Sequence, residues 1–513
     1  MVGVVILPEK TFEKLKNLNK QSVICFVSAL IVGFLSHMYK ISNWLPNWDS
    51  IVFRYDAQNM TGLGRWFLSV VSSMTSFYDL PFLNGVIAIL LYAFGAVCII
   101  KMFDVKSNIT AAIVGATIIS FPAVTSTLMY NYVADAYGVA FLLSCLAAYF
   151  LTKEKTRYII IAIIFIALSS GIYQAYITVT IMLVLCYLIS RAVFEKENTK
   201  SLIKKSLKYI FAGAMGEILY YGILLAILKI SGTELLDYQG ASSFSLADMN
   251  IRASVYLSLY EFFEYFFDFS KGISIFSLLN IVIVSFTGIL YVYSMIKNKV
   301  YAKMPLLLVL FLALPFGASV LLFINSDVIY HNLMKMGYAV FYIFFILLYE
   351  KIEIKREDIK RWVILIISVI LILNQVVIAN VSYHKAQMAY EKSYGTLIRI
   401  ADRAEKAEDG EKCEKLLVIG ALENSKNYFS NLPPEITGIT DGYILRADDE
   451  SVGQSVLCSA LNDYCGKNYK FLSGEEKQEL LKKEEIKNMG VWPSNDSVKK
   501  VDGILIIKLG SEL

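Results

Sequence analysis

The stretch LPFLNGVIAILLYAFGAVCIIK, residues 80–101, has one charged residue, Lys101, at its end. A helix needs about 20 mostly apolar residues to cross the hydrocarbon core of a bilayer, and this stretch has that length. The composition of the whole chain agrees, with 56% hydrophobic and 18% charged residues. We therefore expect an α-helical polytopic membrane protein with about 11 transmembrane helices, near residues 21–39, 80–101, 108–127, 135–151, 158–175, 176–194, 209–230, 273–296, 304–324, 336–350 and 362–380. The runs 158–175 and 176–194 are also compatible with one long or broken element.

Lysine and arginine residues indicate the orientation, because cytoplasmic loops retain them and translocated loops do not. Loops on the side of the N-terminus carry 23 of them, and the opposite loops carry six: Lys40, Arg54, Arg65, Arg252, Lys271 and Lys335. The N-terminus is therefore expected in the cytoplasm, and an odd number of spans places the tail outside it. The first apolar run is long and no small-x-small cleavage site follows it, so we interpret it as a retained anchor.

A change in composition near residue 380 predicts two domains. Residues 1–380 form the transmembrane domain, in which two outward loops, 40–79 and 231–272, are long. The second loop contains SLYEFFEYFFDFSKG (258–272), whose acidic residues recur at helical spacing among aromatic residues, as in a helix lying in the membrane interface. Residues 381–513 are more polar and are expected to form a small extracytoplasmic α/β domain. Its strands are predicted in EKLLVIG (414–420) and VDGILIIKLG (501–510), and its helices in 384–410 and 474–490.

Charge and cysteine content argue against several classes of protein. A net charge of +4 gives little support to nucleic-acid binding. Four of the seven cysteines lie in the expected spans, where a small buried hydrophobe is the ordinary role. In the tail, Cys458 and Cys465 could close a short disulfide loop, although Cys413 is also an available partner. No Cys and His spacing suggests a zinc or haem site.

The first outer loop contains WDSIVFRYDAQNMTGLGRW (48–66), in which polar residues suited to catalysis gather. Asp49 and Asp56 are seven residues apart, a spacing that on a helix returns to one face after about 10 Å. A carboxylate at a membrane boundary loses hydration, which favours a role as a base. Arg65 follows a glycine-rich turn and offers a planar fork for phosphate oxygens. Alternatively, these residues are ordinary interfacial charges that pair with one another.

Weaker candidates lie elsewhere. Asp135 opens the fourth span, where a helix N-cap is an alternative role, and Tyr173 and Gln174 lie at an outer turn, where interfacial side chains are common. Asp327, His331 and Lys335 share an outer loop at four-residue spacing, which could form one face of a short helix that brings a cation to a phosphate. A solvated loop explains the same spacing. Glu217 is expected in the inner half of the seventh span, where a polar contact between helices is its simplest role.

Four segments together resemble a known family. They are the first-loop pattern Asp49-x6-Asp56-x8-Arg65-Trp66 with GLGRW intact, YNYVADAYGVAF (130–141), SSGIYQAY (169–176) and NMGVWPSNDSVKKVDGILIIKLG (488–510). In order and in expected membrane side, this set resembles the GtrII-type glucosyltransferases of bacterial membranes. The resemblance implies a GT-C-like transferase in the bacterial inner or plasma membrane. Such an enzyme moves a sugar from a polyprenyl-phosphate donor to O-antigen or another cell-envelope glycan on the extracytoplasmic side.

The resemblance also implies roles for single residues. Asp49 or Asp56 matches the acidic position expected to deprotonate the acceptor hydroxyl, and Arg65 matches the arginine that we assign to the donor phosphate. His331 and Lys335 are further candidates for that phosphate. The remaining candidates, expected to contact sugar or acceptor hydroxyls, are Trp66, Asp135, Tyr173 and Gln174.

The expected partners are the lipid bilayer, the lipid-linked donor and the envelope glycan. A donor-synthesising transferase and a small flippase complete the functional set that the resemblance implies. The reaction is expected to invert the anomeric centre and to require no cofactor or dedicated metal, although two aspartates could hold a divalent cation loosely.

Three other functions compete with this interpretation. A transporter or flippase of lipid-linked sugars would want charges or broken helices near the midplane and internal pseudo-symmetry, which the sequence does not display. An envelope-glycan polymerase or ligase would typically carry several arginines in a large central outer loop, and here that loop has Arg252 and Lys271. A scaffold that only anchors the outer domain would not need so many spans.

Overall fold

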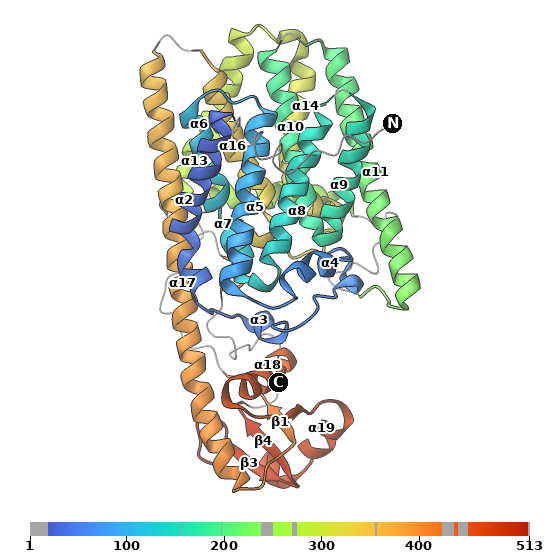
Figure 1. Ribbon diagram of the computed structural model, residues 1–513, viewed down its shortest axis with the longest axis vertical. Coiled ribbons are helices and arrows are strands. Elements are labelled where there is room, and N and C mark those ends of the chain that lie inside the picture. The colour runs from blue at the N-terminus through green and yellow to red at the C-terminus, as the bar shows by residue number, and fades with distance from the viewer. Residues whose placement is uncertain are drawn as a thin grey trace, which may run out of the picture. The chain divides into compact units, whose positions relative to one another are not determined.

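In the computed structural model, the apolar runs of the sequence form long helices that lie side by side (Figure 1). The structure describes residues 19–153, 155–195, 197–236, 250–268, 274–353, 356–422, 436–439 and 450–510. The chain divides into two units. The bundle unit comprises Met1–Ser42, Ala57–Asn380 and Leu432–Thr437, and the C-terminal unit comprises Asn43–Asp56, Val381–Asn431 and Gly438–Leu513.

The bundle unit is built from helices of apolar composition, most of which lie side by side (Figure 1). In chain order they are α2 (Lys20–Ser42), α5 (Pro81–Met102), α6 (Asn108–Ser120), α7 (Pro122–Met129), α8 (Asn131–Leu151), α9 (Thr156–Ile172), α10 (Ile177–Phe194), α11 (Thr199–Ser231), α12 (Ile251–Phe267), α13 (Ile275–Lys297), α14 (Met304–Ala318), α15 (Val320–Ile324) and α16 (Met336–Lys351). The long helix α17 (Glu357–Glu408) belongs to this unit up to Asn380 and to the C-terminal unit from Val381. Successive pairs such as α2 and α5, α5 and α8, α8 and α9, and α9 and α11 pack against each other.

Among the described residues, eight helices are long and apolar enough to cross a membrane, and nine if the bent pair α6 and α7 forms one span. This arrangement is compatible with a membrane protein, but the expected count of 11 is not confirmed. The helix α9, for example, is apolar but has only 17 residues. Proline explains the bend of 40° between α6 and α7, because Pro122 lacks the N–H that would continue the helix.

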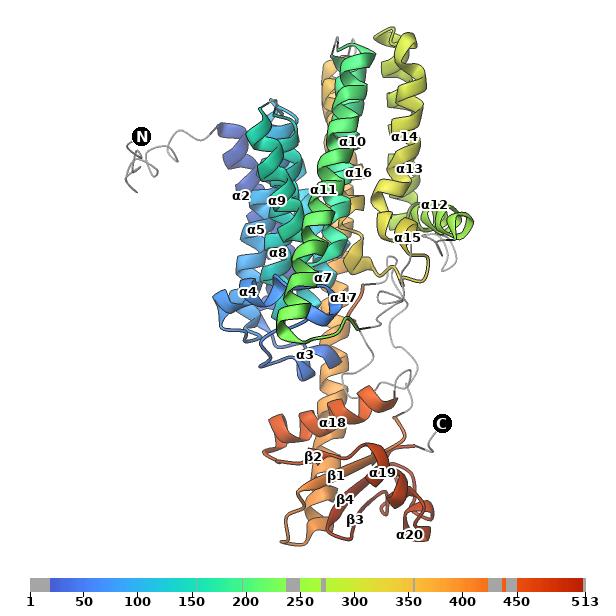
Figure 2. The ribbon, with the colours of Figure 1, turned by 90° about the vertical axis from the view of Figure 1, so that its right-hand side faces the viewer.

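Helix α12 fits the predicted interfacial helix of the second long loop. In Figure 2 it runs across the direction of α13 and α14 instead of alongside them. Its aromatic residues pack against α16, as in the pairs Phe262–Tyr338 and Phe266–Phe341. Residues 269–272, the end of that predicted segment, lie outside the described residues.

The first outer loop continues, within the bundle unit, as short helical turns: η1 (Thr61–Leu63), α4 (Leu68–Ser72) and η2 (Ser73–Thr75). The helix α4 packs against α8 and α9. This part of the loop therefore lies at the bundle end where α2, α9 and α11 finish and where α5 and α8 begin.

A four-stranded sheet forms the centre of the C-terminal unit. Its strands are β1 (Lys415–Ile419), β2 (Lys470–Phe471), β3 (Val498–Val501) and β4 (Ile504–Lys508), in the order β2-β1-β4-β3. The strand β1 pairs in parallel with both neighbours, and β3 and β4 form an antiparallel hairpin. Helices α18 (Glu450–Cys465), α19 (Gly474–Leu481) and α20 (Glu484–Lys487) complete the unit, so the predicted α/β fold is confirmed in its main strands.

Residues of the first loop supply part of the core of this C-terminal unit. The short helix α3 (Trp48–Val52) packs on α18, and Ile51 is 3% exposed among the buried residues of the unit. The Nε1 of Trp44 donates to the hydroxyl of Tyr464 at 2.6 Å. Residues 43–56 are therefore structural members of the C-terminal unit.

The possible disulfide between Cys458 and Cys465 is wrong. Both residues lie in the single helix α18, and both are free thiols. A seven-residue separation in a helix corresponds to a rise of about 10 Å, well beyond the Cα separation that a disulfide tolerates. Burial raises the pKa of Cys458 to about 11, which makes this thiol unreactive.

Candidate functional site

The GLGRW segment forms a tight turn that other parts of the bundle unit hold in place. Gly64 has φ +80°, and a Cβ at this position would lie 2.5 Å from the Tyr220 hydroxyl and 2.6 Å from Gln174 Nε2. The Tyr220 hydroxyl donates to the carbonyl of Gly64 at 3.1 Å, and Gln174 Nε2 donates to the carbonyl of Leu63 at 3.0 Å. The turn thus requires glycine both for its backbone conformation and for space.

This turn directs Arg65 onto tyrosine rings. The Cζ of Arg65 lies 4.7 Å from the centroid of the Tyr173 ring, and its Nη1 lies 3.4 Å from the Tyr137 hydroxyl. The two rings are themselves stacked, with centroids 4.7 Å apart and planes 1° from parallel. An aromatic face holds the plane of a guanidinium parallel to the ring. The N–H donors of the guanidinium then point outward in that plane, the geometry that phosphate oxygens require.

Trp66 is a packing residue. It is 9% exposed in a hydrophobic cluster with Ala167, Tyr220 and Leu224. The next residue, Phe67, donates its backbone N–H to the carbonyl of Gly171 at 2.8 Å. Trp66 therefore joins the first loop to the ends of α9 and α11 and so fixes the position of Arg65.

Asp135 lies in the interior of the same bundle end. It is the fifth residue of α8, which begins at Asn131, so the alternative role as an N-cap is wrong. The Asp135 side chain is buried, and the Thr75 hydroxyl donates to its Oδ2 at 3.0 Å. This hydrogen bond offsets part of the cost of burying the carboxyl group.

Two buried charged residues, Asp79 near Asp135 and Lys40 near Asp79, were not among the predicted site residues. Asp79 is buried directly before α5 and accepts a hydrogen bond from Asn131 Nδ2 at 2.7 Å. Lys40, in the last turn of α2, is 1% exposed, although the sequence placed it in a loop. The charge of Asp79 acts on both Lys40 and Asp135. The available sequence signal was the position of Lys40 and Asp79 directly beside apolar runs.

The two predicted bases have different environments. Asp49 is half-buried in the first turn of α3, whereas Asp56 is exposed in the turn that follows Val52. The helix ends between them, so the expectation that they share one helical face is wrong. Arg54 pairs with Asp463 of α18, with 3.5 Å between Nη1 and Oδ2, instead of with a loop aspartate. Both aspartates belong to the C-terminal unit, whereas Arg65 and Asp135 belong to the bundle unit.

Lys335 is engaged by a residue of α12. Its ammonium forms an ion pair with Glu261, and both side chains are largely buried. The segment before it forms the turn η5 (Asn332–Met334) instead of a helix carrying Asp327, His331 and Lys335 on one face, and His331 is exposed. Lys335 could bind a phosphate only if its attraction to Glu261 is overcome.

Buried Tyr330 lies near Glu261 of one of these regions and near Tyr173 of the other. Burial, together with the charges of Glu261 and of Tyr173 when ionised, raises its pKa well above the usual range. Its hydroxyl donates to the carbonyl of Ala318 at 2.7 Å. Tyr173, Tyr330 and Glu261 therefore lie near one another at this end of the bundle unit.

Two remaining expectations concern Glu217 and metal ions. The Ser170 hydroxyl donates to Glu217 Oε1 at 2.7 Å, which confirms a contact between α9 and α11. Ser170 lies two residues before the end of α9, so the expected location of Glu217 in the inner half is wrong. Within the described ranges, no group of three or more His, Cys, Asp or Glu residues is placed to hold a metal ion. Loose cation binding by Asp49 and Asp56 stays a prediction.

Comparison with known proteins gives one match. The family model described as Glucosyl transferase GtrII matches residues 38–349, which includes Arg65, Asp79, Asp135 and Tyr173. No curated protein and no solved structure matches the chain. The matched residues make up more than half of the chain, which therefore belongs to the GtrII glucosyl transferase family.

Proposed function

We propose that the protein transfers a hexose, glucose by family, from a polyprenyl-phosphate donor to a cell-envelope glycan such as O-antigen. The family match supports a glucosyltransferase, and one structural observation supports the donor class: Arg65 is oriented by Tyr137 and Tyr173 at the end of an apolar helical bundle. A polyprenyl tail must stay in the bilayer while its phosphate and sugar lie at the surface. An arginine at that boundary suits such a donor.

Arg65 binds the phosphate of the donor in this proposal. Its charge stabilises the negative charge that gathers on the phosphate as the glycosidic bond breaks. Tyr173 positions the guanidinium, and Gln174 positions the backbone of the turn. These two residues act through Arg65, in place of the direct sugar contacts expected from the sequence.

A carboxylate removes the proton from the acceptor hydroxyl. The hydroxyl oxygen then bonds to the anomeric carbon while the bond from that carbon to the phosphate oxygen breaks, leaving polyprenyl phosphate and an inverted glycoside. The family resemblance favours Asp49 or Asp56 as the base. Asp135 is a further candidate because it is buried in the same unit as Arg65, with Asp79 beside it.

The remaining parts of the proposal follow from the family and the distribution of positive charge. The fold is of the GT-C type, the site faces the extracytoplasmic side of the bacterial inner or plasma membrane, and the C-terminal unit lies on that side. A separate enzyme supplies the donor on the cytoplasmic face, and a small flippase moves it across. No cofactor is needed, because positioning, a base and a fixed positive charge are sufficient for the transfer.

The test is transfer of radiolabelled glucose from polyprenyl-phosphate-glucose to envelope glycan in membranes that contain equal amounts of each variant. Arg65→Ala and the Asn substitutions of Asp49, Asp56 and Asp135 are compared with wild type. Loss of a general base lowers the rate by about 100-fold or more. Asp327→Asn is the control, because Asp327 is an exposed carboxylate outside the proposed site.

The outcomes separate the candidates. A loss confined to one aspartate variant identifies the base, and a loss with Arg65→Ala supports the phosphate role. Equal transfer by all variants would place the chemistry elsewhere. Wild-type protein that transfers no sugar from any polyprenyl-linked hexose would instead favour a flippase.

A further inference from the structure

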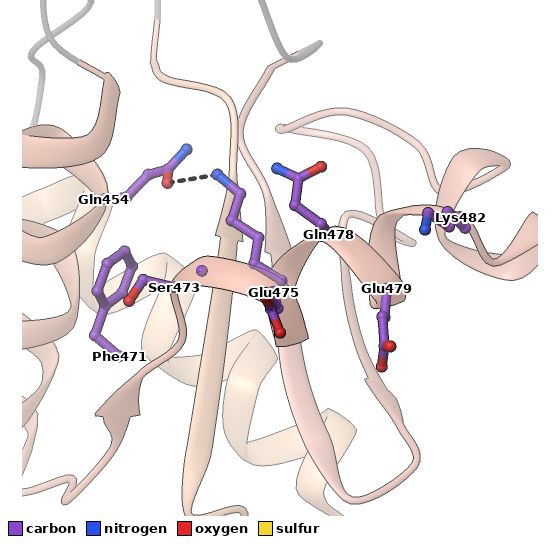
Figure 3. A pocket seen from close by; sticks show the side chains of 9 residues that line it. Gln454, Phe471, Ser473, Glu475, Gln478, Glu479 and Lys482 are labelled. Carbon is purple, nitrogen blue, oxygen red and sulfur yellow. Dashed lines mark hydrogen bonds between the residues drawn. The ribbon is translucent and has the colours of Figure 1, made fainter.

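The C-terminal unit contains a cavity of about 680 Å³ beside the start of α19, within the size range of small-molecule sites (Figure 3). One wall is Gln454 of α18, and another is Phe471 of the edge strand β2. Ser473, residues along α19 and Lys482 directly after it form the rest of the lining. The cavity lies entirely within this unit and shares no residue with the site around Arg65.

Amide, hydroxyl, ammonium and carboxylate side chains line this cavity. Gln454 and Gln478 each offer a donor and an acceptor, and Ser473 offers a hydroxyl. Lys477 and Lys482 contribute positive charge, and Glu475 and Glu479 contribute an equal amount of negative charge. The lining is therefore rich in hydrogen-bonding groups but has no net charge.

One part of the wall is rigid and another is available for a ligand. Gln454 is 2% exposed, its Nε2 reaches the carbonyl of Gly420, and its Oε1 accepts a hydrogen bond from Lys477 at 3.3 Å (Figure 3). By contrast, the side chains of Glu475, Gln478, Glu479 and Lys482 form no hydrogen bond or ion pair with any described residue. Ser473 also makes no side-chain capping bond to α19.

Phe471 adds an apolar surface to this polar lining. Its ring is half-buried at the edge of the sheet, beside the hydroxyl of Ser473 (Figure 3). Sugars have apolar C–H faces and rims of hydroxyl groups, and each hydroxyl both donates and accepts. The aromatic ring therefore suits the C–H face of a sugar, and the amides and charged groups suit its hydroxyls.

We propose that this cavity binds an uncharged, hydroxyl-rich segment of the acceptor glycan, an inference that rests on the proposed transferase function. An anionic ligand would meet Glu475 and Glu479, and a cation would meet Lys477 and Lys482, so the balance of charge favours a neutral ligand. Binding here holds the acceptor polymer on the protein during transfer. It raises the effective concentration of the acceptor hydroxyl near the reaction site.

The experiment measures glycan binding directly, without the donor. The probe is fluorescently labelled polysaccharide released from the envelope of cells that carry the protein, and fluorescence anisotropy is recorded with the purified full-length chain in nanodiscs. The test variant is the double substitution Gln478→Ala and Lys482→Ala. Because both residues are exposed and without partners in the described structure, the variant should fold, and its thermal unfolding is checked against wild type.

Matched controls come from the same unit. Lys412→Ala and Glu485→Ala each remove an exposed charge outside the cavity. We expect the test variant to raise the Kd by about 10-fold or more, as for the loss of hydrogen bonds to sugar hydroxyls, while the controls stay within about 2-fold of wild type. Inorganic phosphate at about 10 mM, a concentration roughly an order of magnitude above the Kd of a weak binding site, should not compete with the glycan.

Three results would overturn the proposal: no binding by wild type, equal binding by the test variant, or displacement of the glycan by phosphate. Donor cleavage is measured in parallel on wild type. If the protein cleaves the donor but the cavity substitutions leave glycan binding unchanged, this inference alone is disproved. A protein that binds glycan through the cavity but neither cleaves nor transfers from any polyprenyl-linked hexose disproves the transferase function instead.

Discussion

Gly171→Ala tests whether the position of Arg65 depends on the packing beneath it. A Cβ at Gly171 would lie 2.7 Å from Cε2 and 2.8 Å from Cζ2 of Trp66, and 3.1 Å from Cβ of Phe67. Ordinary contact begins at 3.4 Å, so the indole ring must move by about 0.7 Å. Trp66 is buried and directly follows Arg65 in the chain, so the shift is passed to the guanidinium.

The expected cost falls more on activity than on stability. Overpacking by one methyl group typically costs about 1–3 kcal/mol of folding free energy, a loss that a bundle of this size tolerates. A displacement of about 1 Å in a positioned group can reduce the rate by about 100-fold. We therefore expect Gly171→Ala to lower glucose transfer by about 10- to 100-fold while the protein still inserts and folds.

The assay is radiolabelled transfer in membranes at matched protein levels, with thermal unfolding of the purified protein measured beside it. Gly213→Ala is the matched control, because a Cβ there would meet nothing within 4 Å and α11 gains about 0.5–1 kcal/mol when glycine is replaced by alanine. If Gly171→Ala transfers glucose at the wild-type rate, Arg65 does not depend on this contact and the proposed positioning is refuted.

Two further predictions concern stability. Ile51→Ala should destabilise the C-terminal unit by about 2–5 kcal/mol, measured by limited proteolysis, whereas Val52→Ala, at an exposed position, should have little effect. In the loop between α10 and α11, burial alone would raise the pKa of Glu197, but hydrogen bonds from Lys205, Ser201 and Arg191 outweigh it and lower the pKa to about 2. Since a depressed carboxyl pKa stabilises the folded state above the unfolded value of 4.5, Glu197→Gln should lower stability at pH 7 by about 1.5–3 kcal/mol. The difference from wild type in thermal unfolding should shrink as the pH falls from 4.5 towards 2; an unchanged difference at pH 3 would contradict this assignment.

Properties that depend on neighbours in the sequence were predictable. Apolar run length located α2, α5 and α13 within a few residues, because burial of a whole helix requires a continuous run. The same logic located β1 and β4, where four and three successive apolar residues, respectively, are buried on both faces of a sheet. The glycines of GLGRW also gave a correct signal, since Gly64 adopts the left-handed conformation.

Contacts between distant residues were not predictable. Lys40 and Asp79 are separated by the whole first loop, and in the sequence each looks like an ordinary charged loop residue. Only the packing of α2 against α5 brings the two residues together. The assignment of residues 43–56 to the C-terminal unit depends on Trp44 meeting Tyr464, 420 residues later. Periodicity describes which face of an element is apolar, but it does not identify the element that covers this face.

The boundary between the two units falls after Asp56, within the first loop, so the candidate bases Asp49 and Asp135 belong to different units. Arg65 and Asp135 are held by one unit, so a mechanism that uses Asp135 depends only on packing within the bundle unit. A mechanism that uses Asp49 draws on a residue whose helix is anchored by Ile51 in the core of the C-terminal unit. Ile51→Ala should therefore reduce transfer strongly if Asp49 is the base, and only weakly if Asp135 is, provided that transfer is measured with a short acceptor that does not need the glycan cavity. The same substitution thus reports on stability through proteolysis and on the identity of the base through the rate.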